Sequence, residues 1–267
     1  RMLLNGPESF TPDGSFMLGE SAETRGFFMG CGLNSVGVAT GGGAGMALAH
    51  CIVHGHTPTD LHEADPKRFP ACFNSVQSLS KRVPEVLGQH YAITYPGLQP
   101  ASARNLVTTP LHQYWVDNGG QFGQFYGWER PLYFNAPGEP GLSFGTPAWF
   151  GQVRAEVDQA HIRAAVFDQS TFGKILVRGP DAERFLHRLC ANDMTRPPGR
   201  MIYTAMLNDR GRFESDLTAM RIDDETYRLY TGTASIARDL SWLRAHLGAG
   251  ERVELEDETA DYAVMGL

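Results

Sequence analysis

The segment YTAMLNDRGRFESDLTAMRI, residues 203–222, decides the fold of the C-terminal half of the chain. Tyr203–Leu207 and Phe213–Ile222 read as strands, and the polar, glycine-containing stretch Asn208–Gly211 between them is typical of a tight turn. The segment therefore predicts an antiparallel hairpin. Because side chains alternate along a strand, one face of the second strand should carry Glu214, Asp216, Thr218 and Met220, and the other Phe213, Ser215, Leu217 and Ala219.

The elements around this hairpin alternate between helix and strand. Strands are predicted at Lys174–Arg178, Tyr227–Gly232 and Arg252–Leu255, with another beginning at Tyr262. Apolar spacing predicts three helices: one starting at Thr146 and Pro147 with Phe150, Val153, Val157, Ala160 and Ala164 on one face; one over Pro180–Cys190 with Ala182, Phe185, Leu186 and Leu189 inward; and one carrying Ile236, Leu240, Leu243 and Leu247, ending at Gly248. Residues 146–267 should form an α+β unit.

The first 66 residues are rich in glycine and carry three short apolar pieces, expected to be strands, at Met2–Leu4, Phe16–Leu18 and Phe27–Met29. A helix should follow, because Ala44, Ala47, Leu48, Cys51 and Ile52 recur at helical spacing and Gly55 suits its C-terminal cap. Residues 67–145 are interpreted as a connecting module with helices near Pro84–Gln89 and Leu111–Asp117 and a surface loop over Asn135–Thr146.

Composition narrows the classes of partner. The formal net charge of −7 argues against sequence-blind binding to nucleic acid or anionic lipid. No apolar run reaches the roughly 18–20 residues that a membrane span needs. The four cysteines have no paired spacing and are expected to be free thiols, and no metal site is predicted, since His50, His54, His56 and His62 lack cysteine or paired carboxylate partners. Neither end has the character of a natural terminus, so we expect a piece of a longer protein.

A glycine cluster, Gly30–Gly37 followed by Gly41–Gly45, is predicted to place backbone N–H groups at the start of the helix, where an electron-rich ligand is favoured. Taken alone, the cluster favours a close packing contact or tight turn over a ligand site. With Asn5–Asp13, however, it resembles the end of the flavoprotein domain of sarcosine and dimethylglycine dehydrogenases. The resemblance implies that the backbone of Gly32, Leu33, Asn34, Ser35, Val36 and Gly37 contacts the FAD ring, with Glu8 and Thr11 nearby.

The C-terminal half carries a second, collinear resemblance. Its motifs, Phe167–Lys174, Ala191–Asp193, Tyr203–Asn208 and Gly211–Thr218, are similar to those of the glycine cleavage aminomethyltransferase domain, which binds tetrahydrofolate. The resemblance implies that Asp216 is the catalytic carboxylate and that Tyr203, Met206 and Thr218 help to hold folate. Family members often have two adjacent acids here, whereas this chain has Ser215 before Asp216. Without the resemblance, Asp216 is a solvated or turn-stabilising residue, and Tyr203 and Met206 are ordinary strand residues.

Together the resemblances imply a chain that crosses the junction of two domains. Residues 1–66 would end an FAD-dependent oxidoreductase domain, 67–145 would connect, and 146–267 would begin the folate domain. The implied activity is FAD-dependent demethylation of an N-methyl amine such as sarcosine or dimethylglycine, with one-carbon transfer to tetrahydrofolate. An electron-transfer flavoprotein is a possible electron acceptor, and bacterial cytoplasm or mitochondrial matrix the expected location. The alternative is a non-catalytic protein resembling the regulatory subunit of pyruvate dehydrogenase phosphatase.

Overall fold

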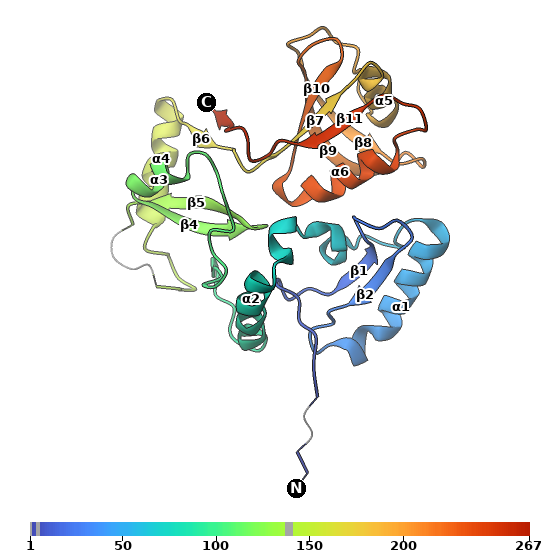
Figure 1. Cartoon of the computed structure of the whole chain (residues 1–267). Coiled ribbons are helices and arrows are strands. Elements are labelled where there is room, and N and C mark those ends of the chain that lie inside the picture. The colour runs from blue at the N-terminus through green and yellow to red at the C-terminus, as the bar shows by residue number, and fades with distance from the viewer. Residues whose placement is uncertain (1, 4–5, 137–140) are drawn as a thin grey trace. The chain divides into compact units, whose positions relative to one another are not determined.

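The computed structural model describes residues 2–3, 6–136 and 141–267 (Figure 1). It divides into two compact units. Unit 1 comprises residues 1–106 and 141–147, and unit 2 comprises residues 107–140 and 148–267. The boundaries of these two units differ from those of the three predicted parts, 1–66, 67–145 and 146–267. The three-part organisation stays a prediction. Leu4, Asn5, Pro137 and Pro140, which belong to predicted motifs or loops, lie outside the described residues; Met2 and Leu3 are not in a strand.

Unit 1 is built on a two-stranded antiparallel sheet. Strands β1 (Met17–Glu20) and β2 (Phe28–Cys31) pair from Met17 opposite Cys31 to Glu20 opposite Phe28, close to the predicted positions. Helix α1 (Gly37–His54) follows, then three short 3-10 helices, His62–Ala64, Pro66–Arg68 and Ala71–Asn74, and helix α2 (Val76–Gln89). The core is small: Leu18 of β1, Ala47 of α1 and Ala64 are buried together.

The glycine cluster lies at a different position relative to helix α1 than we predicted. The helix begins at Gly37, so Gly41–Gly45 lie inside it and not at its N-terminus. Interior residues of a helix donate their N–H groups to carbonyls one turn earlier, so these glycines are not the ligand-facing donors we expected. Of the expected inward face, Ala47 and Cys51 are buried but Ile52 is 54% exposed. Gly55 ends the helix as predicted, with φ of 73° and its N–H donating to the Cys51 carbonyl oxygen.

Helix α2 begins well before the predicted Pro84–Gln89. Its N-cap is Ser75, whose hydroxyl accepts a hydrogen bond from the backbone N–H of Ser78 at 3.1 Å. Pro84 lies inside the helix and not at its start. Capping by a Ser hydroxyl satisfies a donor that the helix cannot pair internally, which explains the early start.

Unit 2 is built around a five-stranded antiparallel sheet of order β11-β7-β10-β9-β8. The strands are β7 (Gly173–Arg178), β8 (Met201–Leu207), β9 (Phe213–Arg221), β10 (Thr226–Thr231) and β11 (Glu254–Asp257). Helices α5 (Ala182–Leu189) and α6 (Ile236–Ala245) cover one face. The other face, which carries Tyr203 and Asp216, is called the open face below. This mixed architecture confirms the predicted α+β class.

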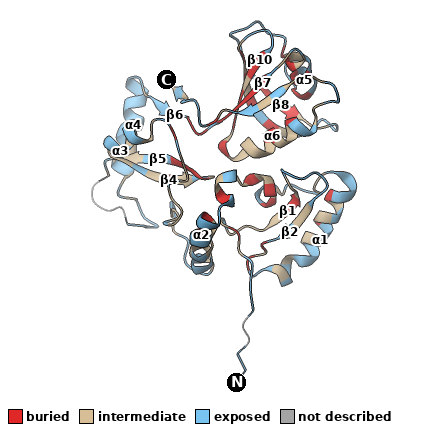
Figure 2. Cartoon of the chain, in the orientation of Figure 1, coloured by how far each residue is buried: buried red, intermediate tan, exposed pale blue. Residues whose placement is uncertain are grey.

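The core of unit 2 lies between the sheet and its two helices. Figure 2 shows the buried residues gathered along β7, β10 and α5. The four inward residues predicted for α5, Ala182, Phe185, Leu186 and Leu189, are all buried, as the helical spacing required. Fully burying a side chain such as Phe185 stabilises by roughly 1.5–3 kcal/mol. This core fixes the strand that carries Asp216.

The rest of unit 2 is a small three-stranded sheet of order β3-β5-β4. Its strands are β3 (Val107–Thr108), β4 (Gly120–Phe125) and β5 (Trp128–Phe134), and helix α3 (His112–Asp117) lies between β3 and β4 in the sequence. Helix α4 (Phe150–Ile162) follows, and β6 (Phe167–Asp168) pairs with β12 (Met265–Gly266).

Helix α4 does not bury the face predicted for it. Phe150 is 49% and Val157 is 50% exposed. Trp149 stacks on Tyr133 of β5 at 5.4 Å between ring centroids, so an aromatic contact just before the helix fixes its start. Further on, α6 ends at Ala245 instead of Gly248, and the final strand pairs at Met265–Gly266 instead of from Tyr262.

Candidate functional site

The open face of the five-stranded sheet presents three of the four predicted folate residues, Tyr203, Asp216 and Thr218, as period-two alternation requires. In β9, Ser215, Leu217 and Ala219 are buried, whereas Asp216 is exposed. Thr218 lies on the same face as Asp216, paired with Tyr203 of β8 and Tyr230 of β10. Around β8 and β9 the sheet therefore has one face packed against helices and one accessible face, whereas Lys174 and Leu176 of β7, on the same side as Asp216, are buried.

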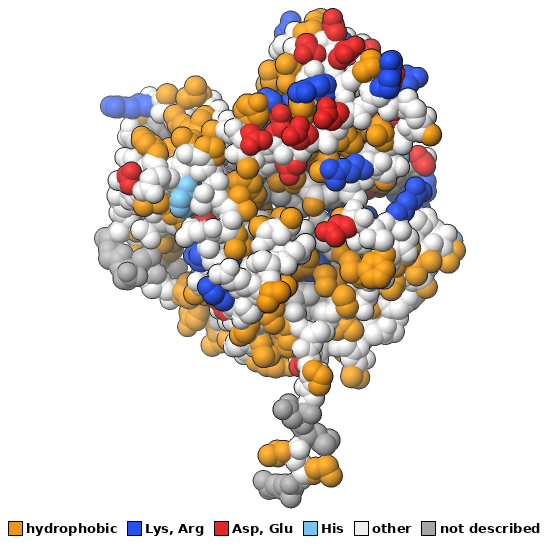
Figure 3. Space-filling model, viewed as in Figure 1, with side chains coloured by type: hydrophobic (Ala, Val, Ile, Leu, Met, Phe, Trp, Pro, Cys, Tyr) orange, Lys and Arg blue, Asp and Glu red, His pale blue; other side chains and the backbone are white. Residues whose placement is uncertain are grey.

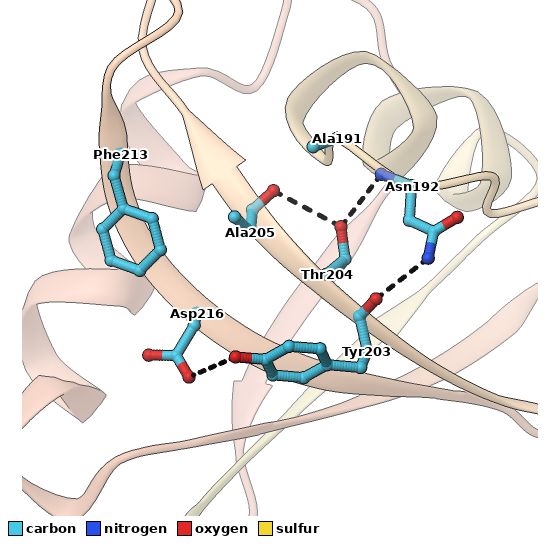
Figure 4. A pocket seen from close by; sticks show the side chains of 7 residues that line it. All are labelled: Ala191, Asn192, Tyr203, Thr204, Ala205, Phe213 and Asp216. Carbon is cyan, nitrogen blue, oxygen red and sulfur yellow. Dashed lines mark hydrogen bonds between the residues drawn. The ribbon is translucent and has the colours of Figure 1, made fainter.

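A shallow pocket of about 450 Å³ lies on this face. Its lining residues are Ala191, Asn192, Tyr203, Thr204, Ala205, Phe213 and Asp216 (Figure 4). The Tyr203 hydroxyl points at Asp216 and donates a hydrogen bond to Oδ2 at 3.2 Å. This bond and the adjacent negative charge raise the pKa of Tyr203 above its usual value, so the phenol stays protonated at neutral pH. Asp216 is thus oriented by a neutral donor.

Phe213 is on the same side as Asp216, which corrects the predicted face. The pairing of β8 with β9 is irregular near the turn: Met206 opposes Ser215, while Leu207 opposes Phe213. Glu214 is the extra residue of this β-bulge, and a bulge reverses the alternation beyond it. Phe213 is 61% and Tyr203 is 68% exposed. Two aromatic side chains therefore flank the carboxylate on an accessible surface.

Asn192 closes one end of the pocket, a role that sequence reasoning did not assign. Its Nδ2 donates to the Tyr203 carbonyl oxygen at 3.0 Å, and its backbone N–H donates to Thr204 Oγ1 at 3.0 Å. Its Oδ1 accepts from the N–H of Asp193. The Asn-Asp sequence after a helix was the available signal, since Asn side chains commonly bond to neighbouring backbone groups in turns.

Met206 does not line the pocket. It is fully buried in the core with Ile202, Leu217 and Leu229. Met206 is an odd number of residues from Tyr203, so the two side chains point to opposite faces of β8. We therefore withdraw the expected folate contact for Met206. The lining residues also do not include Thr218, although it faces the same side as Asp216.

A buried carboxyl lies beneath β9, on the helix side. Asp239 of α6 is 2% exposed and accepts hydrogen bonds from the hydroxyls of Ser215, at 2.8 Å, and Thr231. Burial raises the pKa of Asp239 above its usual value, partly offset by these hydroxyls and by Arg238. Ser215 thus ties the Asp216 strand to α6.

The predicted flavin loop, Gly32–Gly37, lies in unit 1 between β2 and α1. Gly32, Asn34 and Ser35 have φ of 65°, 46° and 67°, so the loop is a left-handed turn that leads into the helix. Ser35 and Val36 are exposed, and a cavity of about 690 Å³ is lined by Asn34 and Val36 together with Phe16, His62 and His90. The loop is therefore not sealed by packing within unit 1.

Asn34 is held inside this loop. Its side chain is 2% exposed, with Oδ1 accepting from the Thr11 N–H at 2.9 Å and Nδ2 donating to the Gly32 carbonyl oxygen at 2.5 Å. Its amide group is therefore occupied in shaping the turn, and the Val36 N–H is also used within the loop, where it donates to the Leu33 carbonyl oxygen at 2.9 Å. What the loop can offer a flavin is the exposed residue Ser35 and the N-terminus of α1, which begins at Gly37. The residues present fit that limited part of a flavin site.

The histidines in the last turns of α1 and just beyond it form a cluster without a metal arrangement. The rings of His50 and His54 are 4.4 Å apart and those of His50 and His56 are 4.8 Å apart, between centroids. His50 Nδ1 and His56 Nδ1 bond to backbone carbonyl oxygens. Within residues 2–3, 6–136 and 141–267, no group of three or more His, Cys, Asp or Glu side chains is placed to hold a metal ion.

In the view of Figure 3, acidic and basic side chains are interspersed over the five-stranded sheet and its helices. No helix in the described part of the chain is long and apolar enough to cross a membrane.

Two family models match the chain. The model described as "FAD dependent oxidoreductase central domain" matches residues 54–109, and "GCVT N-terminal domain" matches residues 111–267. Among curated proteins, human mitochondrial sarcosine dehydrogenase is 38% identical over 81% of this chain and 27% of its own length. The mouse mitochondrial pyruvate dehydrogenase phosphatase regulatory subunit is 34% identical, covering 99% of this chain and 31% of its own.

A bacterial oxidase is equally similar. The 4-methylaminobutanoate oxidase (formaldehyde-forming) of Paenarthrobacter nicotinovorans is 34% identical over 99% of this chain and 32% of its own length. The chain thus spans about a third of the length of the curated relatives it matches.

Proposed function

Since the chain belongs to the GCVT N-terminal domain family and carries an FAD dependent oxidoreductase central domain ahead of it, as in the sarcosine and dimethylglycine dehydrogenase family, we propose that the whole protein oxidatively demethylates an N-methyl amine and passes the one-carbon unit to tetrahydrofolate. The observation that carries the proposal is the open-face pocket, where Asp216, Tyr203 and Phe213 converge. Relatives named for oxidation of N-methyl amines support the first half of the reaction.

The residues of the pocket suit a flat heteroaromatic ligand with N–H groups. Phe213 and Tyr203 offer aromatic faces, and the carboxylate of Asp216 accepts hydrogen bonds. When bound, tetrahydrofolate supplies the secondary amine that receives the one-carbon unit. Asp216 orients that amine and takes its proton, while Tyr203, donating to Oδ2, fixes which carboxylate oxygen faces the ligand. Thr218 stays a proposed contact, because it lies on the same face.

In unit 1, we assign the exposed residues Ser35 and Val36, and the N-terminus of α1 that follows them, to the flavin. FAD, when bound, accepts hydride from the N-methyl carbon. The loop's contribution is to present N–H groups to the part of the flavin where negative charge develops on reduction. The remaining contacts to FAD and the substrate amine would come from parts of the protein outside these 267 residues. Electron-transfer flavoprotein as acceptor, and a bacterial cytoplasmic or mitochondrial location, stay proposals.

The test uses the full-length protein. Dye-coupled flavin reduction is measured with sarcosine, dimethylglycine and 4-methylaminobutanoate, and free formaldehyde is measured with and without tetrahydrofolate. We expect reduction by at least one amine and less free formaldehyde when folate is present. Asp216→Asn should leave flavin reduction unchanged and abolish the folate effect. Absence of flavin reduction by every N-methyl amine would overturn the oxidative part.

A regulatory function is the second candidate, favoured by the 34% identity to the pyruvate dehydrogenase phosphatase regulatory subunit over almost the whole chain. The upstream sequence distinguishes the two. An intact dinucleotide-binding fingerprint and a flavin-tethering histidine favour the enzyme, and their loss favours the regulator.

A further inference from the structure

An ion pair between the buried Arg68 and the partly exposed Asp13 joins two segments of unit 1 that are far apart in sequence. Arg68, whose side chain is 5% exposed, donates from Nε to Asp13 Oδ2 at 2.7 Å and from Nη2 to Asp13 Oδ1 at 3.1 Å. Nη2 also donates to the Ser15 carbonyl oxygen at 2.6 Å. Two parallel N–H bonds to one carboxylate fix both direction and distance, which a Lys in this place would not do. Arg68 therefore sets the shape of the turn from Thr11 to Ser15.

That turn holds the loop that we assign to the flavin. Thr11 is 2% exposed; its hydroxyl donates to the Ser15 carbonyl oxygen at 2.8 Å, and its N–H donates to Asn34 Oδ1 at 2.9 Å. Asn34 Nδ2 then donates to the Gly32 carbonyl oxygen. A Cβ atom at Gly32 would lie 2.5 Å from Thr11 Cγ2, so the two segments are in direct contact. Arg68, Asp13, Thr11 and Asn34 thus form a continuous chain of contacts that ends at the loop.

We propose that Arg68 and Thr11 are positioning residues for the loop Gly32–Gly37, acting through Asp13 and Asn34. This inference rests on the proposed flavin function of that loop. Arg68 lies in the segment that matches the oxidoreductase central domain. The central domain is then a structural part of the flavin site and not only a connector.

The chain of contacts is suited to this task because the loop has unusual backbone geometry. Asn34 and Ser35 both have positive φ, a conformation that L-residues adopt at a cost and keep only when their surroundings enforce it. Asn tolerates it better than most residues, and its side-chain bonds to Thr11 and Gly32 supply the constraint. Loss of the constraint should let the loop relax, which moves its N–H groups away from any flavin beside it.

The experiment uses the full-length holoprotein and matched pairs of variants. Thr11→Val keeps the shape and removes the hydroxyl, whereas Thr11→Ser keeps the hydroxyl. Arg68→Met removes both the charge and the paired N–H donors of the guanidinium group, whereas Arg68→Lys keeps only the charge. Thr57→Val is the control, because the Thr57 hydroxyl bonds only locally, to the carbonyl oxygen of Thr59. The readouts are hydrogen exchange of residues 28–38 and the two-electron midpoint potential of the flavin.

Thr11→Val and Arg68→Met should raise exchange in residues 28–38 by about tenfold or more. They should also weaken stabilisation of the reduced flavin by about tenfold, which is a potential about 30 mV more negative. Thr11→Ser and Thr57→Val should behave like the wild type, and Arg68→Lys should fall between.

Unchanged exchange and potential in Thr11→Val and Arg68→Met would overturn the inference. If either variant fails to fold, Arg68→Lys decides the matter: wild-type values there would overturn it. A wild-type protein that binds no FAD would instead sink the proposed function, and the exchange measurement would still test the positioning.

Discussion

Replacement of Gly32 by Ala is predicted to destabilise unit 1 by two separable effects. Gly32 has φ of +65°, where an L-residue pays about 1 kcal/mol relative to Gly. The new Cβ would also lie 2.5 Å from Thr11 Cγ2, against a usual carbon separation of roughly 3.5–4.0 Å. Overpacking of this kind costs typically 1–3 kcal/mol. The sum is about 2–4 kcal/mol.

Two companion variants separate these effects. Gly26 also has positive φ, of +79°, but nothing lies within 4 Å of a Cβ there, so Gly26→Ala should cost only the conformational part, about 1 kcal/mol. Thr11→Ser removes the methyl group that meets the new Cβ. The double variant Gly32→Ala/Thr11→Ser should therefore recover most of the steric part and cost about 1–2 kcal/mol.

The assay must follow unit 1 alone. All four tryptophans, Trp115, Trp128, Trp149 and Trp242, lie in unit 2, so tryptophan fluorescence reports on that unit and serves as the control. Hydrogen exchange of peptides within residues 6–106, measured across a denaturant series, gives the free energy of unfolding of unit 1. Equal losses in Gly32→Ala and Gly26→Ala, or no recovery in the double variant, would refute the assigned contact between Gly32 and Thr11.

Further predictions concern three residues of unit 2. Asp239→Ala should destabilise unit 2 by about 2–3 kcal/mol, because the buried hydroxyls of Ser215 and Thr231 lose their acceptor. Burial raises the pKa of Asp239 above its usual value of 3.8. The stability that the protonated Asp239 contributes is therefore fully present below pH 3.8 and is lost as pH rises through the folded-state pKa. Fluorescence-monitored melts of Asp239→Asn should lack this loss. Burial lowers the pKa of Lys174 from 10.5 to about 8. The stability that the neutral amine contributes is therefore present above pH 10.5 and is lost as pH falls through about 8. In the same melts, Lys174→Met should not show this change. Tyr203→Phe should leave the thermal melt of unit 2 unchanged, because the side chain is exposed, yet raise the tetrahydrofolate dissociation constant roughly three- to tenfold in calorimetric titrations by freeing Asp216.

The sequence predicted the elements whose periodicity is strong. The hairpin of β8 and β9, the inward face of α5 around Phe185 and the Gly55 cap follow from alternation, helical spacing and the freedom of glycine to adopt positive φ. The family was predicted from motifs that no periodicity explains, and the two collinear family models confirm it.

The errors have separate physical causes. Phe213 was assigned to the wrong face because the bulge at Glu214 leaves no mark in a two-residue pattern. Met206 was assigned by resemblance, although its spacing from Tyr203 already required the opposite face. Helix α1 starts at Gly37 despite four interior glycines, because turn geometry at Asn34 and Ser35 directs the chain into the helix.

The tertiary contacts were beyond sequence reasoning. Nothing in the local sequence pairs Arg68 with Asp13 or Asp239 with Ser215, since each pair is joined only by folding. The exposure of α4 likewise depends on which partner its apolar side chains meet, and spacing alone predicts only that they share a face.

The most direct test of the central claim follows the methyl carbon itself. Full-length protein with tetrahydrofolate is given sarcosine or dimethylglycine labelled with carbon-13 in the methyl group, and the products are followed by NMR. The account predicts that the label appears as methylenetetrahydrofolate, and as formaldehyde hydrate when Asp216 is replaced by Asn. Label that appears as formaldehyde hydrate in the wild type with folate present, or that never leaves the amine, would contradict it.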